Sequence, residues 1–516
     1  MGVSDNNTTN YKTQLNGRLQ YETTIAQNHN IGAMFVYSEE YWHTRSTGAS
    51  RNDRIHPSTS EINAALTNVQ SNSGSSASEG LRSYIGRMNY SAYDKYLLEF
   101  SFRVDGSSKF IKGHQYGFFP TVAVGWRFTE EEFLKKYLSS WLSSGKLRAS
   151  WGKLGDNSGV DRFEQLETLT AMNYMSSDVV KGFVNKKMIN KDLSWEVSTD
   201  INVGLDLGFL NNRLRTEIDF YNRLRTGMNR PSQMSIHLTG AYSAPRANIG
   251  DLLNRGLELN LTWKDKICNV EYSVNLNGAY NRTVLKEWNE FLSRGWVYLD
   301  MPYHFLYVYE NNGIAQTWQD IYNNTPQGLS PGDVIRKDLN GDGIIDGKDK
   351  KAYPNIQRDR PTTTYGITLQ AAWKGFDISM LFNGGLGRKD FWLTDFNNTA
   401  FADRRYASTW DHWTEPWSLE NRGGEWPRLG TSTDRSDNSY WLYNMNYLRM
   451  KNIMLGYNLP KKLLSKISMT NLRIYASAEN LFTVTQYPGL DPEKKNSARD
   501  LYPINRSFSI GLNVSF

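Results

Sequence analysis

The chain has 516 residues, of which 39% are hydrophobic, and its mean hydropathy is -0.60. No stretch approaches the roughly 18 consecutive apolar residues of a membrane-spanning helix, so the composition excludes a helical membrane protein but allows a polar-lined transmembrane β-barrel. The formal net charge of +6 is small for this length and the basic residues are dispersed, which gives no support to nucleic-acid binding.

Alternation of apolar with small or polar residues recurs along the whole chain, and this period of two is the pattern of a strand with two unlike faces. In the clearest case Leu98, Phe100 and Phe102 share one face, while Glu99 and Ser101 share the other. About fifteen such strands are predicted, near residues 11–22, 29–37, 81–90, 96–104, 122–128, 147–154, 201–209, 213–222, 257–263, 270–276, 365–373, 375–384, 447–457, 471–482 and 508–516.

The final strand carries Phe508, Ile510, Leu512, Val514 and Phe516 on one face and small or polar residues on the other. A barrel wall explains this pattern, because lipid would cover the apolar face and the lumen would cover the polar one. An edge strand of a soluble β-domain is the alternative for this segment alone.

The connections between the predicted strands alternate between short and long. Short links, or links with one small helix, fall near residues 25–28, 91–94, 129–141, 210–212, 264–268, 374 and 460–467, while long ones fall near 38–80, 105–118, 155–192, 226–254, 283–362, 387–440 and 483–502. Antiparallel strands with every long loop on one side are typical of an outer-membrane barrel, whereas sandwiches and propellers do not sort loop lengths in this way. The predicted fold class is therefore all-β, an antiparallel transmembrane β-barrel with long extracellular loops. Thr129 and Glu132 are expected to form a capping box at the helix of 129–141.

One motif in the longest loop, residues 283–362, has the spacing of a calcium-binding loop. Oxygen ligands for one structural Ca²⁺ are expected from Asp338, Asn340, Asp342, the carbonyl of Ile344, Asp346 and Asp349. The turn that this loop requires is expected at Gly343, and the short Asp349 at the last position predicts modest affinity. An Asx-rich turn without an ion is the alternative.

Catalytic signatures are weak, so the chain is not predicted to be an enzyme. Gly328–Gly332 matches G-x-S-x-G, but Pro331 has no N–H to donate to an oxyanion hole. The seven histidines form no H-x-x-x-H pair that would indicate a zinc site.

Several segments resemble the barrel of the SusC/RagA-type TonB-dependent outer-membrane transporters. These segments span nearly the whole length and comprise Tyr84–Tyr90, Asp94–Leu98, Arg103–Phe110, Phe119–Trp126, Leu193–Glu196, Tyr447–Ile453, Glu479–Thr483 and Tyr487–Glu493. The calcium-type loop and the final Phe516 also resemble that family.

The resemblance implies import of oligosaccharides, or of peptides, across the cell outer membrane. It also implies a SusD-like surface lipoprotein as a lid, and the TonB–ExbB–ExbD complex as the energy source, reached through an amino-terminal part that this sequence does not show. Large plugged transporters have 22 strands, so about fifteen strands predict that residues 1–516 are the carboxy-terminal part of the barrel, without the plug domain and the first strands. No signal peptide is predicted at the polar amino terminus.

Two other functions are compatible with the sequence. A surface glycan-binding or adhesin-like β-protein would use aromatic loops such as residues 410–417, although Trp in a loop more often packs against its neighbours. A glycoside hydrolase would need two carboxylates that converge in a cleft. The sorting of loop lengths and the terminal aromatic residue favour the transporter.

Overall fold

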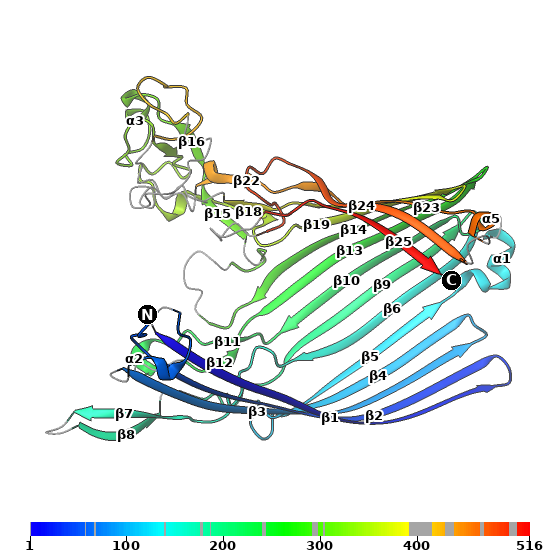
Figure 1. The fold of residues 1–516 in the computed structure, drawn as a ribbon, viewed down its shortest axis with the longest axis horizontal. Coiled ribbons are helices and arrows are strands. Elements are labelled where there is room, and N and C mark those ends of the chain that lie inside the picture. Colours follow the sequence, from blue (N-terminus) through cyan, green and yellow to red (C-terminus); the bar gives the residue numbers. More distant parts are fainter. Residues whose placement is uncertain are drawn as a thin grey trace.

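The computed structural model describes residues 2–56, 58–66, 69–138, 141–175, 179–185, 187–239, 244–290, 298–302, 305–391, 415–428, 438–464, 469–494 and 503–515. Its main element is one antiparallel sheet of fifteen strands, which curves into an open trough (Figure 1). The strands, in the order of the sheet, are β1 (Val3–Ile25), β2 (His29–Arg51), β3 (Gln70–Ala92), β4 (Tyr96–Ser107), β5 (Tyr116–Trp126), β6 (Leu142–Asp156), β9 (Glu196–Phe209), β10 (Leu214–Thr226), β13 (Asp251–Ile267), β14 (Val270–Glu287), β19 (Thr363–Trp373), β20 (Phe376–Leu386), β23 (Tyr447–Asn458), β24 (Asn471–Thr485) and β25 (Ser507–Ser515). Each of the fifteen predicted strands coincides with one of them.

The first three strands are longer than the sequence predicted, at 23 residues each. Residues 38–51 and 70–80, which were expected to belong to a long connection, continue the ladder up to the pairs Val3↔Arg51 and Arg51↔Gln70. That expectation was wrong because backbone pairing between neighbouring strands continues through polar sequence, where apolar alternation no longer reveals it.

The two faces of the sheet differ as the alternation predicts. Leu98 and Phe100 are 44% and 42% exposed although both are large and apolar, so neither is packed into a core. On the opposite face of the same strand, Glu99 forms an ion pair with Arg87 of β3, with 2.6 Å between Nη2 and Oε2. This arrangement confirms that the apolar face does not line a closed soluble core. Phe516, expected on the same face of the last strand, lies outside the described residues.

Tight turns join the strands at one end of the sheet (Figure 1). Positive φ angles at Ala26, Tyr93, Asn211, Cys268 and Lys374 mark these turns, at the positions where the sequence predicted short links. Two links at this end contain the short helices α1 (Glu132–Leu138) and α5 (Lys461–Leu464).

The predicted capping box of Thr129 and Glu132 is wrong. Thr129 lies inside the 3₁₀ helix η2 (Phe128–Glu130), and its hydroxyl accepts a hydrogen bond from the N–H of Gly145 at 2.9 Å. That bond ties Thr129 to β6 and removes it from the start of α1.

The long connections lie together at the opposite end of the sheet and carry small elements of their own (Figure 1). Paired short strands there are β7 (Leu169–Met175) with β8 (Val179–Asn185), β11 (Asn229–Pro231) with β12 (Arg246–Asn248), β15 (Phe305–Tyr309) with β18 (Lys350–Gln357), β16 (Asn311–Ile314) with β17 (Val334–Arg336), and β21 (Lys389–Phe391) with β22 (Leu442–Asn444). The helices are α2 (Ile236–Thr239), α3 (Trp318–Tyr322), η1 (Ile62–Ala64), η3 (Gly347–Asp349) and η5 (Ser439–Trp441). None of the helices in the described part of the chain is long and apolar enough to cross a membrane.

Candidate functional site

The longest connection folds into a small body, which we call the loop module and define as residues 305–357. Within it β15 pairs with β18 and β16 pairs with β17, while α3 lies between β16 and β17 in the chain. The module projects beyond the long-connection end of the sheet (Figure 1). The predicted loop of residues 283–362 is therefore structured at its centre.

An apolar cluster fixes the base of the loop module to the rest of this end. Its buried members come from three separate connections and are Leu306, Val308, Phe391, Trp441, Met445 and Tyr487. Trp441 and Met445 are almost completely buried, with 1% and 0% of their surface exposed. Such burial stabilises by roughly 1.5–3 kcal/mol per large side chain, so these three connections form one packed unit.

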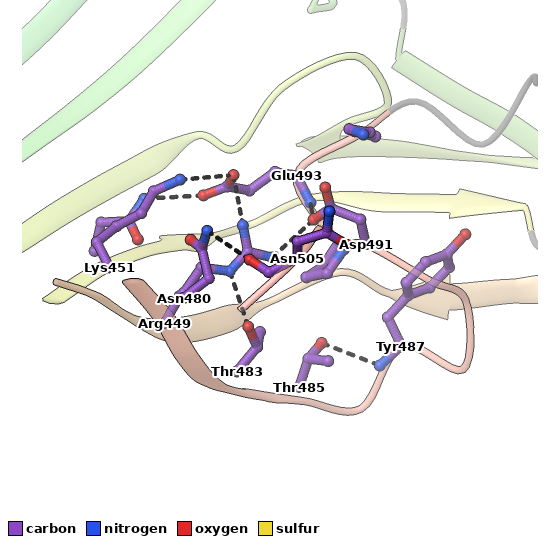
Figure 2. A network of polar contacts seen from close by, with 12 residues as sticks. Arg449, Lys451, Asn480, Thr483, Thr485, Tyr487, Asp491, Glu493 and Asn505 are labelled. Carbon is purple, nitrogen blue, oxygen red and sulfur yellow. Dashed lines mark hydrogen bonds and ion pairs between the residues drawn. The ribbon is translucent and has the colours of Figure 1, made fainter. Parts of the chain in front are cut away.

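A polar network next to this cluster centres on Arg449 of β23 (Figure 2). Its guanidinium donates to Asp491 and to Glu493, each with 2.8 Å between nitrogen and oxygen, and to the hydroxyl of Thr483 at 2.8 Å. Arg449 and Asp491 are 3% and 1% exposed. Because both charges are buried, each depends on the other for the hydrogen bonds that it has lost to water.

A second buried arginine, Arg388, holds the same segment by its backbone. Its Nη1 donates to the carbonyl oxygens of Pro492 and Glu493, and its Nη2 donates to that of Lys494, at 3.0–3.1 Å. We call residues 487–494 the clamped segment, because Arg449 binds its carboxylates and Arg388 binds its backbone carbonyl groups.

The charges around Glu493 decide its ionisation. Burial opposes the carboxylate, but the hydrogen bonds from Asn383 and Tyr447 and the charges of Arg449 and Lys451 leave the pKa of Glu493 below its ordinary value. Glu493 is therefore ionised at neutral pH, which is the state that Arg449 requires.

The calcium-type motif forms a compact loop on the loop module. The side chains of Asp338, Asn340, Asp342 and Asp346 each accept hydrogen bonds from backbone N–H groups two to five positions later. Gly343 has φ of +79° and supplies the turn that the motif predicts. Such nested Asx turns expose oxygen atoms on a short stretch of chain.

Asp349 closes this loop from a buried position, with 0% of its surface exposed. The N–H of Asp346, followed by those of Leu339 and Asn340, holds the pKa of Asp349 below its ordinary value although burial opposes ionisation. Its two oxygens thus bind the two ends of the loop together.

The donor atoms of the motif are of the kind that Ca²⁺ prefers, since all six expected ligands supply oxygen. Within the described ranges, however, no group of three or more His, Cys, Asp or Glu side chains is gathered closely enough to hold a metal ion. The structure brings the predicted residues into one loop, and the carbonyl of Ile344 lies in the same loop, so calcium binding stays a prediction.

The polar face of the sheet carries a cavity of about 810 Å³ near the tight-turn end, and its lining includes Arg87, Glu99, Lys146, Arg148 and Asn202. Beside it, Arg148 of β6 bridges to Asp206 of β9 at 2.7 Å and to Asp219 of β10 at 2.9 Å. This face is thus charged and hydrogen-bonded across neighbouring strands, as a water-filled lumen requires.

Sequence reasoning singled out the segments that contain Arg449, Asp491 and Glu493 but gave no sign that they meet. Arg388 escaped notice altogether, since no pattern distinguishes it from the other arginines. Within the aromatic segment of residues 410–417, Trp417 is buried and donates through Nε1 to Gln316 at 2.9 Å. It therefore packs on the loop module, while residues 410–414 lie outside the described part of the chain.

Comparison with known proteins supports the resemblance over most of the chain. The family model described as "TonB dependent receptor-like, beta-barrel" matches residues 2–481. TonB-dependent receptor P3 of Formosa agariphila is 30% identical over 476 residues, which cover 84% of this chain and 45% of that protein. TonB-dependent receptor SusC of Bacteroides thetaiotaomicron is 31% identical over 457 residues, which cover 84% of this chain and 44% of that protein.

Among solved structures, the RagAB peptide transporter matches with a TM-score of 0.83 over 99% of this chain and 56% of that chain, at 22% identity. At this identity the match shows that the two chains share a fold. The chain spans less than half the length of the two curated relatives.

Proposed function

This chain belongs to the TonB-dependent receptor-like β-barrel family, and on that premise we propose that it forms part of the wall of a TonB-coupled channel that imports oligosaccharides or peptides. The family is one of outer-membrane receptors and transporters rather than enzymes, which places the chain in the cell outer membrane. The import itself belongs to the whole protein, of which this chain corresponds to about half.

The observation that carries the proposal is the contrast between the two faces of one continuous fifteen-stranded sheet. Apolar side chains such as Leu98 and Phe100 are exposed on one face, and ion pairs such as Arg148–Asp206 cover the other. A wall between lipid and a wet lumen needs both faces at once, whereas a surface glycan-binding protein needs only a polar exterior.

The fifteen strands fit a barrel of 22 strands if seven others complete the ring. We infer that this chain supplies the carboxy-terminal part of that barrel and that the plug and the contact with TonB–ExbB–ExbD come from the amino-terminal part of the protein. The share of the relatives' length that the chain covers supports this division.

The connections gathered at one end offer a surface for a partner outside the cell. We infer that the loop module and the clamped segment contribute to the contact with a SusD-like surface lipoprotein, which would close over an oligosaccharide or peptide ligand. The packed apolar cluster supports a role in docking, because a rigid surface binds with less loss of conformational freedom.

The import proposal is tested in cells that carry the complete gene and in matched cells that lack it. Labelled oligosaccharides and labelled tryptic peptides are supplied separately, and internalised label is measured with and without a protonophore. We expect uptake of one class in the gene-bearing cells only, and its loss with the protonophore.

Two results would contradict the proposal. Equal uptake in cells that lack the gene would show that the protein is not the route of entry. Label that binds to the cell surface but is never internalised, with or without protonophore, would support the surface glycan-binding alternative instead.

We further propose that the loop of Asp338–Asp349 binds Ca²⁺ as a structural ion, with Asp338, Asn340, Asp342, Ile344, Asp346 and Asp349 as oxygen donors. Four of these carboxylates lie within twelve residues, and a cation among them would relieve their mutual repulsion. The ion would hold the loop module in shape and would take no part in transport chemistry.

Calorimetry on the complete protein tests the calcium proposal, with Asp338→Ala and Asp342→Ala as variants. We expect loss of calcium binding and faster proteolysis within residues 283–362. Asp161→Ala, an exposed carboxylate in another connection, serves as the control and should bind calcium as the wild type does. The proposal fails if the wild type takes up no calcium at millimolar concentration, which is within the range of extracellular modules.

A further inference from the structure

The outward, apolar face of the sheet changes character on β10, β13 and β14 as these strands approach the long-connection end. Leu257 is exposed on this face, with Phe220 of β10 and Tyr280 of β14 directly beside it in the register. Two residues further along β13 the same face presents Arg255, flanked by Asn222 and Arg282. The next row on this face, which comprises Leu224, Leu253 and Val284, is apolar again, but Leu253 is buried there, with 6% of its surface exposed. The accessible apolar surface of β13 thus ends at a row that contains two arginines.

Arg255 and Arg282 lie directly opposite each other on neighbouring strands. Like charges in this position repel, and the repulsion is destabilising unless something compensates it. Arg255 donates through Nε to the amide oxygen of Asn222 at 2.7 Å, which is a neutral partner. Within the described residues neither arginine forms an ion pair with a carboxylate, and the buried Nε of Arg282 meets no acceptor.

A groove of about 420 Å³ opens over this row, and its lining includes both arginines, Tyr280, Lys286 and Asp300. Lys286 and Asp300 form an ion pair with each other, so they cancel in the charge of the groove. The two arginines therefore leave the groove with an excess of positive charge above an apolar floor.

The height of this row relative to the membrane follows from the strand. The apolar residues of this face of β13 run from Leu257 to Trp263, and the one further apolar residue, Leu253, is buried. Arg255 lies about 7 Å beyond Leu257 toward the long connections. Strands of such a wall tilt by roughly 35–45°, so Arg255 lies about 20 Å from Trp263 along the membrane normal, close to the edge of an apolar band roughly 25 Å tall. The long side chains of the two arginines are therefore within reach of the lipid headgroups. The long connections face the cell exterior, so this level belongs to the outer leaflet.

We propose that Arg255 and Arg282 bind the phosphate monoester of an outer-leaflet glycolipid whose acyl chains lie along Leu257 and Phe220. A guanidinium fork matches the geometry of phosphate oxygens and forms hydrogen bonds that charge strengthens. One phosphate placed between the arginines would supply the acceptor that Nε of Arg282 lacks and would remove the repulsion between the strands. The bound lipid belongs to the membrane and is separate from the imported ligand.

The complete protein, purified in detergent, is titrated with diphosphorylated lipid A, and binding is followed by native mass spectrometry. The double variant Arg255→Gln/Arg282→Gln should bind this lipid about ten-fold or more weakly, because each charged hydrogen bond contributes on that order. The control is Arg223→Gln, which lies next to Asn222 on the opposite face and pairs with Asp200. That control should bind lipid A as the wild type does.

A second arm identifies the group that is recognised. Lipid A without phosphate should bind the wild type as weakly as it binds the double variant, and millimolar inorganic phosphate should not displace the phosphorylated lipid. Equal binding of the two lipids, displacement by free phosphate, or unchanged binding in the double variant would each overturn the proposal. Thermal unfolding shows whether the double variant is correctly folded, because without lipid it should unfold at the same temperature as the wild type. Addition of lipid A should then raise the unfolding midpoint of the wild type but not that of the double variant.

Discussion

Arg449 is one of the two arginines that hold the clamped segment, and it is the one that binds the carboxylates. Arg449 and Asp491 are both buried. Removal of one partner of such a buried ion pair is strongly destabilising, although the intact pair stabilises the fold little or not at all relative to a pair of apolar residues. The role of Arg449 is therefore to position the chain, because the hydrogen bonds from its guanidinium fix the path of the last long connection where it leaves β24.

Replacement of Arg449 by Met should destabilise the clamped segment by about 3–5 kcal/mol, since Asp491 would remain a buried charge without its cationic partner and would keep the hydrogen bond from the N–H of Glu493. Hydrogen exchange of residues 487–494 in the complete protein measures this loss. The control Arg82→Met removes an ion pair to Glu39 in which both side chains are more than 40% exposed, and it should cost less than about 1 kcal/mol. Adding Asp491→Leu to Arg449→Met should restore part of the protection; a double variant as weak as the single one would contradict this account.

Protonation of Glu493 should loosen the same segment. The pKa of Glu493 is lower in the folded protein than in the unfolded chain, so its contribution is present above the unfolded value of about 4.3 and is lost as the pH falls through the folded value. Hydrogen exchange of the clamped segment should therefore accelerate selectively between neutral pH and the acid range below that value, after correction for intrinsic exchange. Glu493→Gln should remove this change with pH, and a variant that keeps it would assign the titration to another group.

At the scale of elements, the strands were more predictable than the connections. A strand between two unlike environments must alternate, and this requirement is visible in the sequence at β4, β13 and β19. The short strands of the loop module, by contrast, depend on partners such as Phe305↔Gln357 that are distant in the chain. The polar ends of β1, β2 and β3 were not predicted for a related reason. Both faces of these strand ends are polar, so the sequence shows no alternation there.

In the candidate site, too, contacts between residues close in the sequence were predicted, and contacts between residues far apart in the sequence were not. The calcium-type loop was predicted because all of its residues lie within twelve positions. The contact between Arg449 and Asp491 joins residues 42 positions apart, and Arg388 reaches carbonyl groups more than 100 positions away. Contacts of that length follow from the order of the strands and from the path of the loops, which a single sequence does not specify.

The difference between the faces can be tested on adjacent residues of β13. Leu259→Lys should destabilise the barrel by about 2–4 kcal/mol, because it places a charge in the apolar band, while Glu258→Lys on the opposite face should have a much smaller effect. Urea unfolding of the complete protein in lipid vesicles measures both. Equal effects of the two substitutions would show that this part of β13 does not face lipid.

The fifteen-stranded sheet has two free edges, β1 and β25. Each edge presents a row of backbone donors and acceptors, which are costly to leave unpaired in lipid and prone to pair with another chain in water. We expect the isolated chain to form no closed barrel and to give no heat-modifiable band in detergent, whereas the complete protein should give one. A compact, protease-resistant monomer of the isolated chain would contradict this expectation.

The order of strands in the sheet also has a kinetic consequence. Since every strand of the main sheet pairs with the next one along the chain, apart from the small strands in the connections, assembly can proceed hairpin by hairpin, with little chain to close at each tight turn. The steps across the long connections are slower, and the step from β14 to β19 crosses the longest of them. Closing residues 288–362 as a flexible loop would cost on the order of 3 kcal/mol more than closing a three-residue turn. Pairing of β15 with β18 brings Phe305 and Gln357 together beforehand, so early folding of the loop module would shorten this connection and speed the arrival of the next strand.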